Sequence, residues 1–131
     1  MKITVVGAGY VGISLATLLS QNDEVIIHDI DQNKVNQINK RISPVFDREI
    51  TDFFKNKKLR LKATSSAHVG LKDAGFIIVC TPTNYDITTS EFDVSKVESV
   101  ISEVVKLKIE ASIIIKSTVP VGFTENMKKK F

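Results

Sequence analysis

Apolar and polar residues alternate along this chain in blocks that are typical of β-strands and amphipathic helices. Short apolar or β-branched runs have the length of strands, and polar or glycine-containing turns bound them. These runs predict strands over residues 3–6, 24–29, 59–63, 75–80 and 112–116. Between them, apolar residues recur at helical spacing, which predicts helices. Such alternation is what a parallel sheet requires, because each crossover between parallel strands passes through a helix.

The segment after Asp93 carries the strongest helical pattern, and Asp93 is a favoured residue for capping its start. Its apolar stripe consists of Val94, Val97, Val100, Ile101, Val104 and Val105. Further helices are predicted over residues 13–19, 31–41, 48–55, 65–72 and 124–131, and residues 81–92 are expected to form a polar loop. We therefore expect one domain with a Rossmann-type, doubly wound parallel sheet in three layers and strand order 3-2-1-4-5.

Three glycines separate the first predicted strand from the first predicted helix at G-x-G-x-x-G spacing: Gly7, Gly9 and Gly12. Gly7 lets the chain turn sharply off the strand. Gly9 lets the backbone approach a pyrophosphate, and Gly12 lets the helix lie close to the sheet. The helix then starts with free N–H groups and a partial positive charge that favour an anion. This unit predicts a dinucleotide site, although the glycine spacing alone also recurs in methyltransferases.

Asp29 ends the second predicted strand about twenty residues after the glycines, where a carboxylate accepts hydrogen bonds from the adenosine ribose. It would also repel a 2′-phosphate, which favours NAD over NADP. The alternative is that Asp29 caps the following helix, since aspartate is a favoured cap residue. Asp31 is the better candidate for that cap, because the helical pattern begins directly after it.

Two hydroxyl-rich loops follow predicted strands whose carboxyl ends lie at the same edge of the sheet. They are Thr81-Pro82-Thr83-Asn84 and Ser117-Thr118-Val119-Pro120-Val121-Gly122. Ligands of doubly wound sheets bind outside the carboxyl ends of the strands, where the strand order reverses. Both loops could be ordinary strand-ending turns, but their place beside the glycine motif favours a binding cleft.

Composition limits the remaining possibilities. The 131 residues amount to one domain, and no apolar run is long enough to span a membrane. The net charge of +3 is mild, and the lysine clusters at residues 55–58 and 128–130 lack interleaved aromatic residues, so we expect no nucleic-acid partner. One cysteine excludes an internal disulfide, and a strand starting at residue 2 leaves no room for a signal peptide. We expect a cytoplasmic protein without a metal site.

The motifs Gly7–Gly12, Asp29, Thr81-Pro82-Thr83 and Lys116–Gly122 together resemble the N-terminal NAD-binding domain of the UDP-glucose/GDP-mannose dehydrogenase family. They run from the first predicted strand to the last, so the resemblance covers essentially the whole chain. The run Lys116–Gly122 is the most discriminating and favours the UDP-glucose branch over the mannose and N-acetylmannosamine branches. The resemblance implies NAD as cofactor, oxidation of the C6 alcohol of a nucleotide sugar to a carboxylate, and a homodimer for the whole enzyme.

The resemblance also implies roles for individual residues of the cofactor site. It puts Tyr10 and Val11 against the pyrophosphate, and Asp29 and Lys34 at the adenosine ribose. It puts Thr83 along the cofactor. It implies that Thr118 lies near the nicotinamide, where a hydroxyl that donates and accepts could orient a water or the substrate alcohol. Thr118 is therefore the candidate catalytic residue, with a role in the turn after the fifth strand as the alternative.

The same resemblance implies that the rest of the enzyme lies outside these residues. The family's nucleophilic cysteine and its sugar-nucleotide pocket follow beyond residue 131. We expect residues 1–131 to be the N-terminal part of a longer dehydrogenase, able to bind NAD but not to turn over, and to meet a UDP-sugar only together with that longer part. Cys80 is no substitute for the nucleophile, because we expect it within a buried strand as an inert, small hydrophobic residue.

Two interpretations from other classes remain. Nucleotide-sensing modules that gate channels and transporters share the strand–glycine–helix–aspartate pattern, but they give no reason for the hydroxyl-rich loops. Dehydrogenases of β-hydroxyacids have a similar glycine turn, but they are expected to carry a glycine-rich segment where this chain has Lys116–Gly122.

Overall fold

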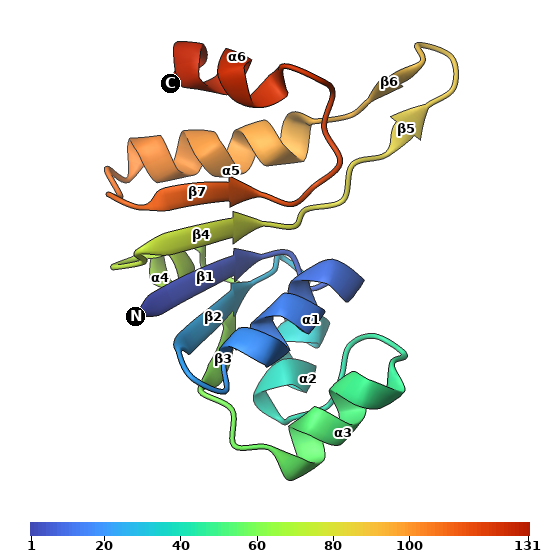
Figure 1. Ribbon diagram of the computed structural model, residues 1–131, viewed down its shortest axis with the longest axis vertical. Coiled ribbons are helices and arrows are strands. Elements are labelled where there is room, and N and C mark those ends of the chain that lie inside the picture. The colour runs from blue at the N-terminus through green and yellow to red at the C-terminus, as the bar shows by residue number, and fades with distance from the viewer.

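A parallel sheet of five strands in the order β3-β2-β1-β4-β7 forms the centre of the computed structural model, which describes residues 1–131 (Figure 1). The strands are β1 (Lys2–Val6), β2 (Glu24–His28), β3 (Leu61–Thr64), β4 (Phe76–Val79) and β7 (Ser112–Ile115). In the central register Ile3 pairs with Val25 on one side and Phe76 on the other. Because β7 is the fifth strand of this sheet along the chain, the order corresponds to the predicted 3-2-1-4-5 and confirms the doubly wound sheet.

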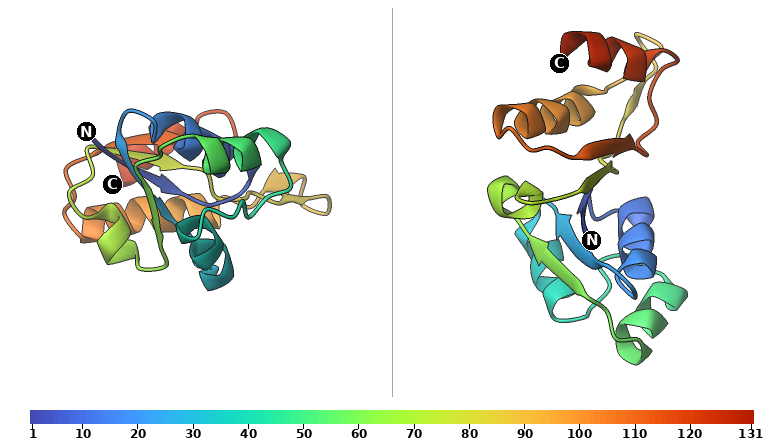
Figure 2. Two further views of the ribbon diagram at one scale, coloured as in Figure 1. Left: turned by 90° about the horizontal axis from the view of Figure 1, so that it is seen from below. Right: turned by 60° about the vertical axis from the view of Figure 1, so that its left-hand side comes forward.

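Helices cover both faces of this sheet, so the molecule has three layers (Figure 2). They are α1 (Tyr10–Leu19), α2 (Gln32–Asn39), α3 (Arg48–Asn56), α4 (Ala67–Leu71), α5 (Ser95–Lys106) and α6 (Phe123–Lys130). The first three helices share one apolar core with Val5 and Ile27 of the central strands. The last three share the other core with Ile77 and Val79. Alternate strand residues supply the two cores because side chains along a strand point to opposite faces.

Local capping explains where several helices begin. Asp31 caps α2, as predicted, because its carboxylate accepts the N–H groups of Asn33 at 2.9 Å and Lys34 at 3.4 Å. Asp47 caps α3 by accepting the N–H of Ile50 at 2.9 Å. Each bond satisfies an N–H that has no partner within its own helix.

Three boundaries differ from the sequence prediction. The helix α1 already begins at Tyr10, and β3 is shifted to Leu61–Thr64. Val94 rather than Asp93 occupies the cap position of α5, although the Asp93 carboxylate accepts the N–H of Ser95 at 3.0 Å. Hydrogen bonds from Ser95 lower the pKa of this exposed carboxyl. The predicted starts were wrong by a few residues because propensity marks an element better than its ends.

The expectation that residues 81–92 form a polar loop was wrong in part. Strands β5 (Tyr85–Asp86) and β6 (Glu91–Phe92) pair there as an antiparallel hairpin that projects from the sheet (Figure 1). The rings of Tyr85 and Phe92 contact edge to face, with centroids 5.1 Å apart. Such cross-strand aromatic pairs stabilise a hairpin, but two-residue strands are too short to produce a detectable alternation.

Candidate functional site

A cavity of about 840 Å³ lies at the carboxyl ends of β1, β2, β4 and β7. It is the place where strand order reverses and where ligands of doubly wound sheets bind. The structure gathers around it every site residue predicted from the sequence except Gly12: Gly7, Gly9, Tyr10, Val11, Asp29, Lys34, Thr83 and Thr118. The lysines at positions 34, 96 and 116 outnumber the carboxylates of Asp29 and Glu103 in its lining, so the cavity favours an anionic ligand.

The glycine turn brings three backbone segments into close contact. Gly7 has a φ of 104°, a conformation that favours glycine, and a Cβ there would lie 2.7 Å from the carbonyl oxygen of Cys80. A Cβ on Gly12 would overlap the carbonyl oxygen of Gly7. Gly12 therefore lies beneath the cavity rather than in its wall, and it lets α1 begin directly against the turn.

Gly9 differs from these two glycines because a Cβ there would meet no atom within 4 Å. The open space faces the cavity, above the start of α1. Gly9 supplies no side-chain cap, and the first turn of α1 holds no acidic residue. The N–H groups of Tyr10 and Val11 consequently have no hydrogen-bond acceptor within the chain. Uncapped N–H groups beside open space fit a pyrophosphate, which accepts such bonds and interacts favourably with the helix dipole.

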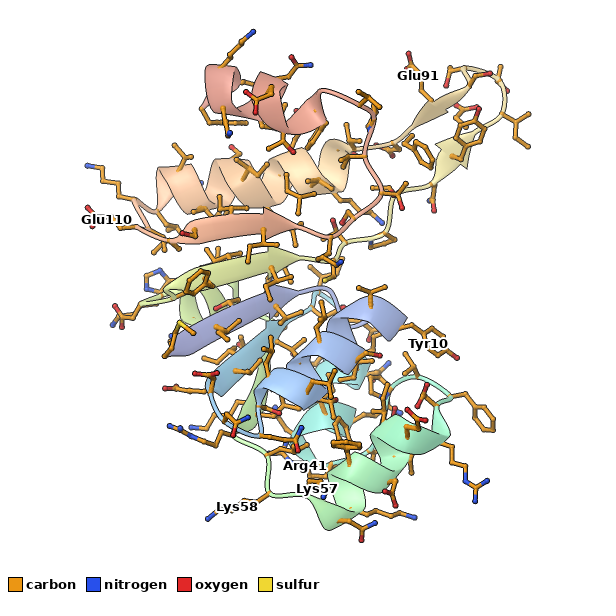
Figure 3. All side chains as sticks on the ribbon, in the orientation of Figure 1. Tyr10, Arg41, Lys57, Lys58, Glu91 and Glu110 are labelled. Atoms are coloured by element: carbon orange, nitrogen blue, oxygen red, sulfur yellow. The ribbon has the colours of Figure 1, made fainter.

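Tyr10 extends away from α1 toward the loop between α2 and α3 (Figure 3). Its hydroxyl donates a hydrogen bond to the carbonyl of Phe46 at 3.1 Å. The residue as a whole is 57% exposed and lines the cavity at the same time. This contact ties the loop before α3 to the edge of the cavity.

Asp29 joins the end of β2 to the glycine turn. One carboxylate oxygen accepts the N–H of Ala8, and the other accepts the N–H of Asp31, both at 2.8 Å. Asp29 is therefore not the cap of α2, a role that belongs to Asp31. An ionised carboxylate has about four acceptor positions, so both oxygens keep capacity for a pair of ribose hydroxyls. The two backbone bonds fix the orientation in which the carboxylate meets them.

The two hydroxyl-rich loops meet on the opposite side of the cavity. The Ser117 hydroxyl donates to the carbonyl of Thr81 at 2.7 Å, and the Thr81 and Ser117 hydroxyls are 3.4 Å apart. Thr83 is half-buried and Thr118 is exposed, so both side chains are accessible to a ligand in the cavity. The structure thus brings the Thr83 and Thr118 loops together, as expected from their places after β4 and β7.

Sequence reasoning missed one wall of the cavity. It is formed by α5, through Lys96, Ser99, Val100 and Glu103. Their spacing of three, one and three residues puts them on one face of the helix. That spacing is visible in the sequence, but Val100 also belongs to the apolar stripe of the helix, and the stripe alone predicts only contact with the core.

Cys80 lies one residue after β4, half-buried in the wall of the cavity, and not within the strand as predicted. Burial raises the pKa of its thiol to about 11, and the charge of Lys116 opposes this shift without cancelling it. The thiol therefore stays protonated at neutral pH, and a protonated thiol is a poor nucleophile. No group of histidine, cysteine or carboxylate side chains has the arrangement of a metal site. No helix is both long and apolar enough to cross a bilayer.

The profile of the UDP-glucose/GDP-mannose dehydrogenase family, NAD binding domain, matches residues 1–131. The chain belongs to this family. Membership confirms the resemblance carried by the glycine, Thr81–Thr83 and Lys116–Gly122 motifs, and it identifies NAD as the cofactor of the domain.

Relatives in this family are longer than the present chain. A UDP-glucose 6-dehydrogenase of Streptococcus pneumoniae is 44% identical over all of this chain, which spans 33% of that protein. A UDP-glucose 6-dehydrogenase of Campylobacter jejuni is 41% identical, with 34% of its length spanned. A solved GDP-mannose dehydrogenase from Pseudomonas aeruginosa superimposes on 97% of the chain with a TM-score of 0.87 at 26% identity, and the match spans 30% of that chain. The chain thus spans about a third of the relatives it matches.

Proposed function

We propose that the cavity binds NAD in an extended form, with each part of the cofactor on a different segment of the chain. The pyrophosphate lies over Gly9 and accepts the free N–H groups of Tyr10 and Val11. The adenosine ribose lies against Asp29 and Lys34, and the nicotinamide lies between Thr83 and Thr118. The observation that carries this assignment is the open space above Gly9. The uncapped N–H groups of α1 lie on one side of it, and the Asp29 carboxylate, fixed by its bond from Ala8, lies on the other as the ribose acceptor.

Within a chain of the relatives' length, we propose that the domain serves a UDP-glucose 6-dehydrogenase, which oxidises UDP-glucose to UDP-glucuronate. Bound NAD supplies the hydride acceptor for this oxidation. The support is the identity of 44% and 41% to proteins named for that activity. A related nucleotide-sugar dehydrogenase is the alternative, because solved enzymes for GDP-mannose and for UDP-D-ManNAc match the fold at 26% and 28% identity.

Thr118 is the residue of this chain that we assign to the reaction. Its hydroxyl is exposed at the mouth of the cavity, next to Ser117, whose own proton is directed to Thr81. A free hydroxyl there can accept a hydrogen bond from a substrate alcohol or donate one to a water. Its role is to orient those groups, since a threonine hydroxyl is too weak an acid or base to carry the proton itself.

The domain belongs to a homodimer in the cytoplasm, and it meets its sugar substrate through residues that follow position 131 in the longer relatives. Residues 1–131 alone bind NAD without producing NADH, because the sugar whose alcohol would give up the hydride is held by residues that follow position 131 in the longer relatives.

A domain exchange tests the dehydrogenase assignment directly. Residues 1–131 replace the matching segment of the Streptococcus pneumoniae relative, and NADH formation from UDP-glucose is followed by absorbance. We expect turnover in the chimera, strong loss on Thr118→Ala, and none from residues 1–131 alone. A folded chimera that binds NAD but never forms NADH would favour the nucleotide-sensing alternative. NADH formed by residues 1–131 alone would overturn the assignment of the remaining chemistry to a longer chain.

A further inference from the structure

The loops that carry Thr83 and Thr118 come from different strands, and one side chain links them. Ser117 takes part in every hydrogen bond between the two loops. Its hydroxyl donates to the Thr81 carbonyl at 2.7 Å, which is a favourable O–H···O distance. Its contacts of 3.4 Å to the Thr81 hydroxyl and the Val79 carbonyl are too long to contribute as much.

The backbone beside Ser117 is anchored to the sheet and cannot follow a ligand freely. The N–H groups of Lys116 and Ser117 both donate to the carbonyl of Val79, at 2.8 and 3.1 Å. Ser117 is half-buried, and Thr118 directly after it is exposed to the cavity. The link therefore fixes where Thr118 emerges relative to the loop that leads to Thr83.

We propose that Ser117 is a positioning residue that sets the width of the nicotinamide end of the cavity, an inference that rests on the proposed NAD pose. The single hydroxyl proton is used by the Thr81 carbonyl, so Ser117 acts on the cofactor through Thr83 and Thr118. Removing the hydroxyl leaves the Thr81 carbonyl without this partner and lets the Thr81–Asn84 loop move away from Thr118, while the backbone of residue 117 stays bonded to the Val79 carbonyl. The adenosine end, built from Asp29 and Gly9, shares no hydrogen bond with Ser117 and keeps its shape.

The variant Ser117→Ala tests this division of the site by calorimetric titration of the 131-residue chain with NAD and with AMP, which carries only the adenosine phosphate half. Loss of one intramolecular hydrogen bond corresponds to about a threefold to tenfold change in an equilibrium constant. We expect NAD affinity to fall by that factor, AMP affinity to stay within about twofold, and Ser117→Thr to recover NAD affinity.

Ser112→Ala is the matched control, because Ser112 begins β7, the strand that leads to Ser117, is exposed, and makes no side-chain hydrogen bond. It should leave both affinities unchanged. Unchanged NAD affinity in Ser117→Ala would overturn the proposal. An equal fall for NAD and AMP would also overturn it, because the effect would then be a general loss of structure.

Amide hydrogen exchange without any ligand gives a second readout that does not depend on the NAD pose. We expect faster exchange in Ser117→Ala at Asp93, whose N–H donates to the Asn84 carbonyl at 2.8 Å and so reports on the loop that carries Thr83, with the strands unchanged. Exchange equal to that of the parent chain would overturn the proposal. If neither NAD nor AMP bound to the parent chain while exchange changed as expected, the proposed NAD pose would fail and the link between the loops would stand.

Discussion

Gly9 and Gly12 lie three residues apart in one motif, yet the structure assigns them opposite sensitivities to the same added methyl group. A Cβ on Gly12 would overlap the Gly7 carbonyl oxygen, and a backbone atom cannot move aside as a flexible side chain can. The start of α1 would have to shift away from the turn. A Cβ on Gly9 would meet nothing within 4 Å, and the φ of −81° and ψ of −171° there suit alanine.

The magnitudes follow from these two environments. Overpacking against a rigid neighbour costs about 1–3 kcal/mol, so we expect Gly12→Ala to lower the free energy of unfolding by about 3 kcal/mol. For a domain of this size that corresponds to a fall in Tm of about 10 °C. Gly9→Ala should change the free energy of unfolding by less than about 1 kcal/mol, because the loss of a cap glycine and the reduced freedom of the unfolded chain oppose each other.

For NAD affinity the order is reversed, and Gly9→Ala is the variant expected to lose it. The Gly9→Ala methyl group occupies the space assigned to the pyrophosphate, so NAD affinity should fall by at least about tenfold in a fully folded protein. Thermal unfolding followed by circular dichroism and calorimetric titration with NAD measure the two effects on the same samples. Gly12→Ala as stable as the parent chain would refute the close approach of α1 to the turn. Gly9→Ala with undiminished NAD affinity would refute the pyrophosphate position.

Three further outcomes test other parts of the structure. Because burial raises the pKa of the Cys80 thiol from its ordinary value to about 11, its reaction with iodoacetamide at pH 8, followed by mass spectrometry, should be about 100-fold slower in the folded chain than after unfolding in urea. The rate should rise as the pH approaches 11, and equal rates in the folded and unfolded chain would contradict the burial of this thiol. Asp29→Ala should lower unfolding free energy by about 1–3 kcal/mol, because the N–H groups of Ala8 and Asp31 lose their acceptor, and urea titration measures this. Ile27→Ala, at a fully buried position, should destabilise by about 2–5 kcal/mol in the same titration, and a change below about 1 kcal/mol would show that the core had been misassigned.

The sheet was predictable because its signals are local and repeated. Each strand is an apolar run, each crossover contains a helix, and the glycine turn fixes which strand is central. The Asp31 cap was equally predictable, because a cap acts on the N–H groups two and three residues after it. The hairpin of Tyr85–Phe92 was missed because its stability comes from one aromatic contact across the turn rather than from a periodic pattern.

The candidate site was predictable in its residue types and only partly in its contacts. Asp29 was expected to face a ribose, but its bonds to Ala8 and Asp31 come from the way β2 ends beside the glycine turn. The bond from Ser117 to Thr81 joins residues 36 positions apart, so no local pattern contains it. Contacts of this kind depend on strand order, which has to be known before they can be derived.

Calorimetric titration of the 131-residue chain with NAD, with NADP as control, tests the central claim most directly. The claim is that the cavity at the carboxyl ends of the strands is an NAD site whose ribose acceptor is Asp29. We expect NAD to bind, NADP to bind at least about tenfold more weakly because the Asp29 carboxylate repels a 2′-phosphate, and the difference to shrink in Asp29→Ala. A chain with a folded circular dichroism spectrum that binds no NAD, or that binds NADP equally well, would contradict the claim.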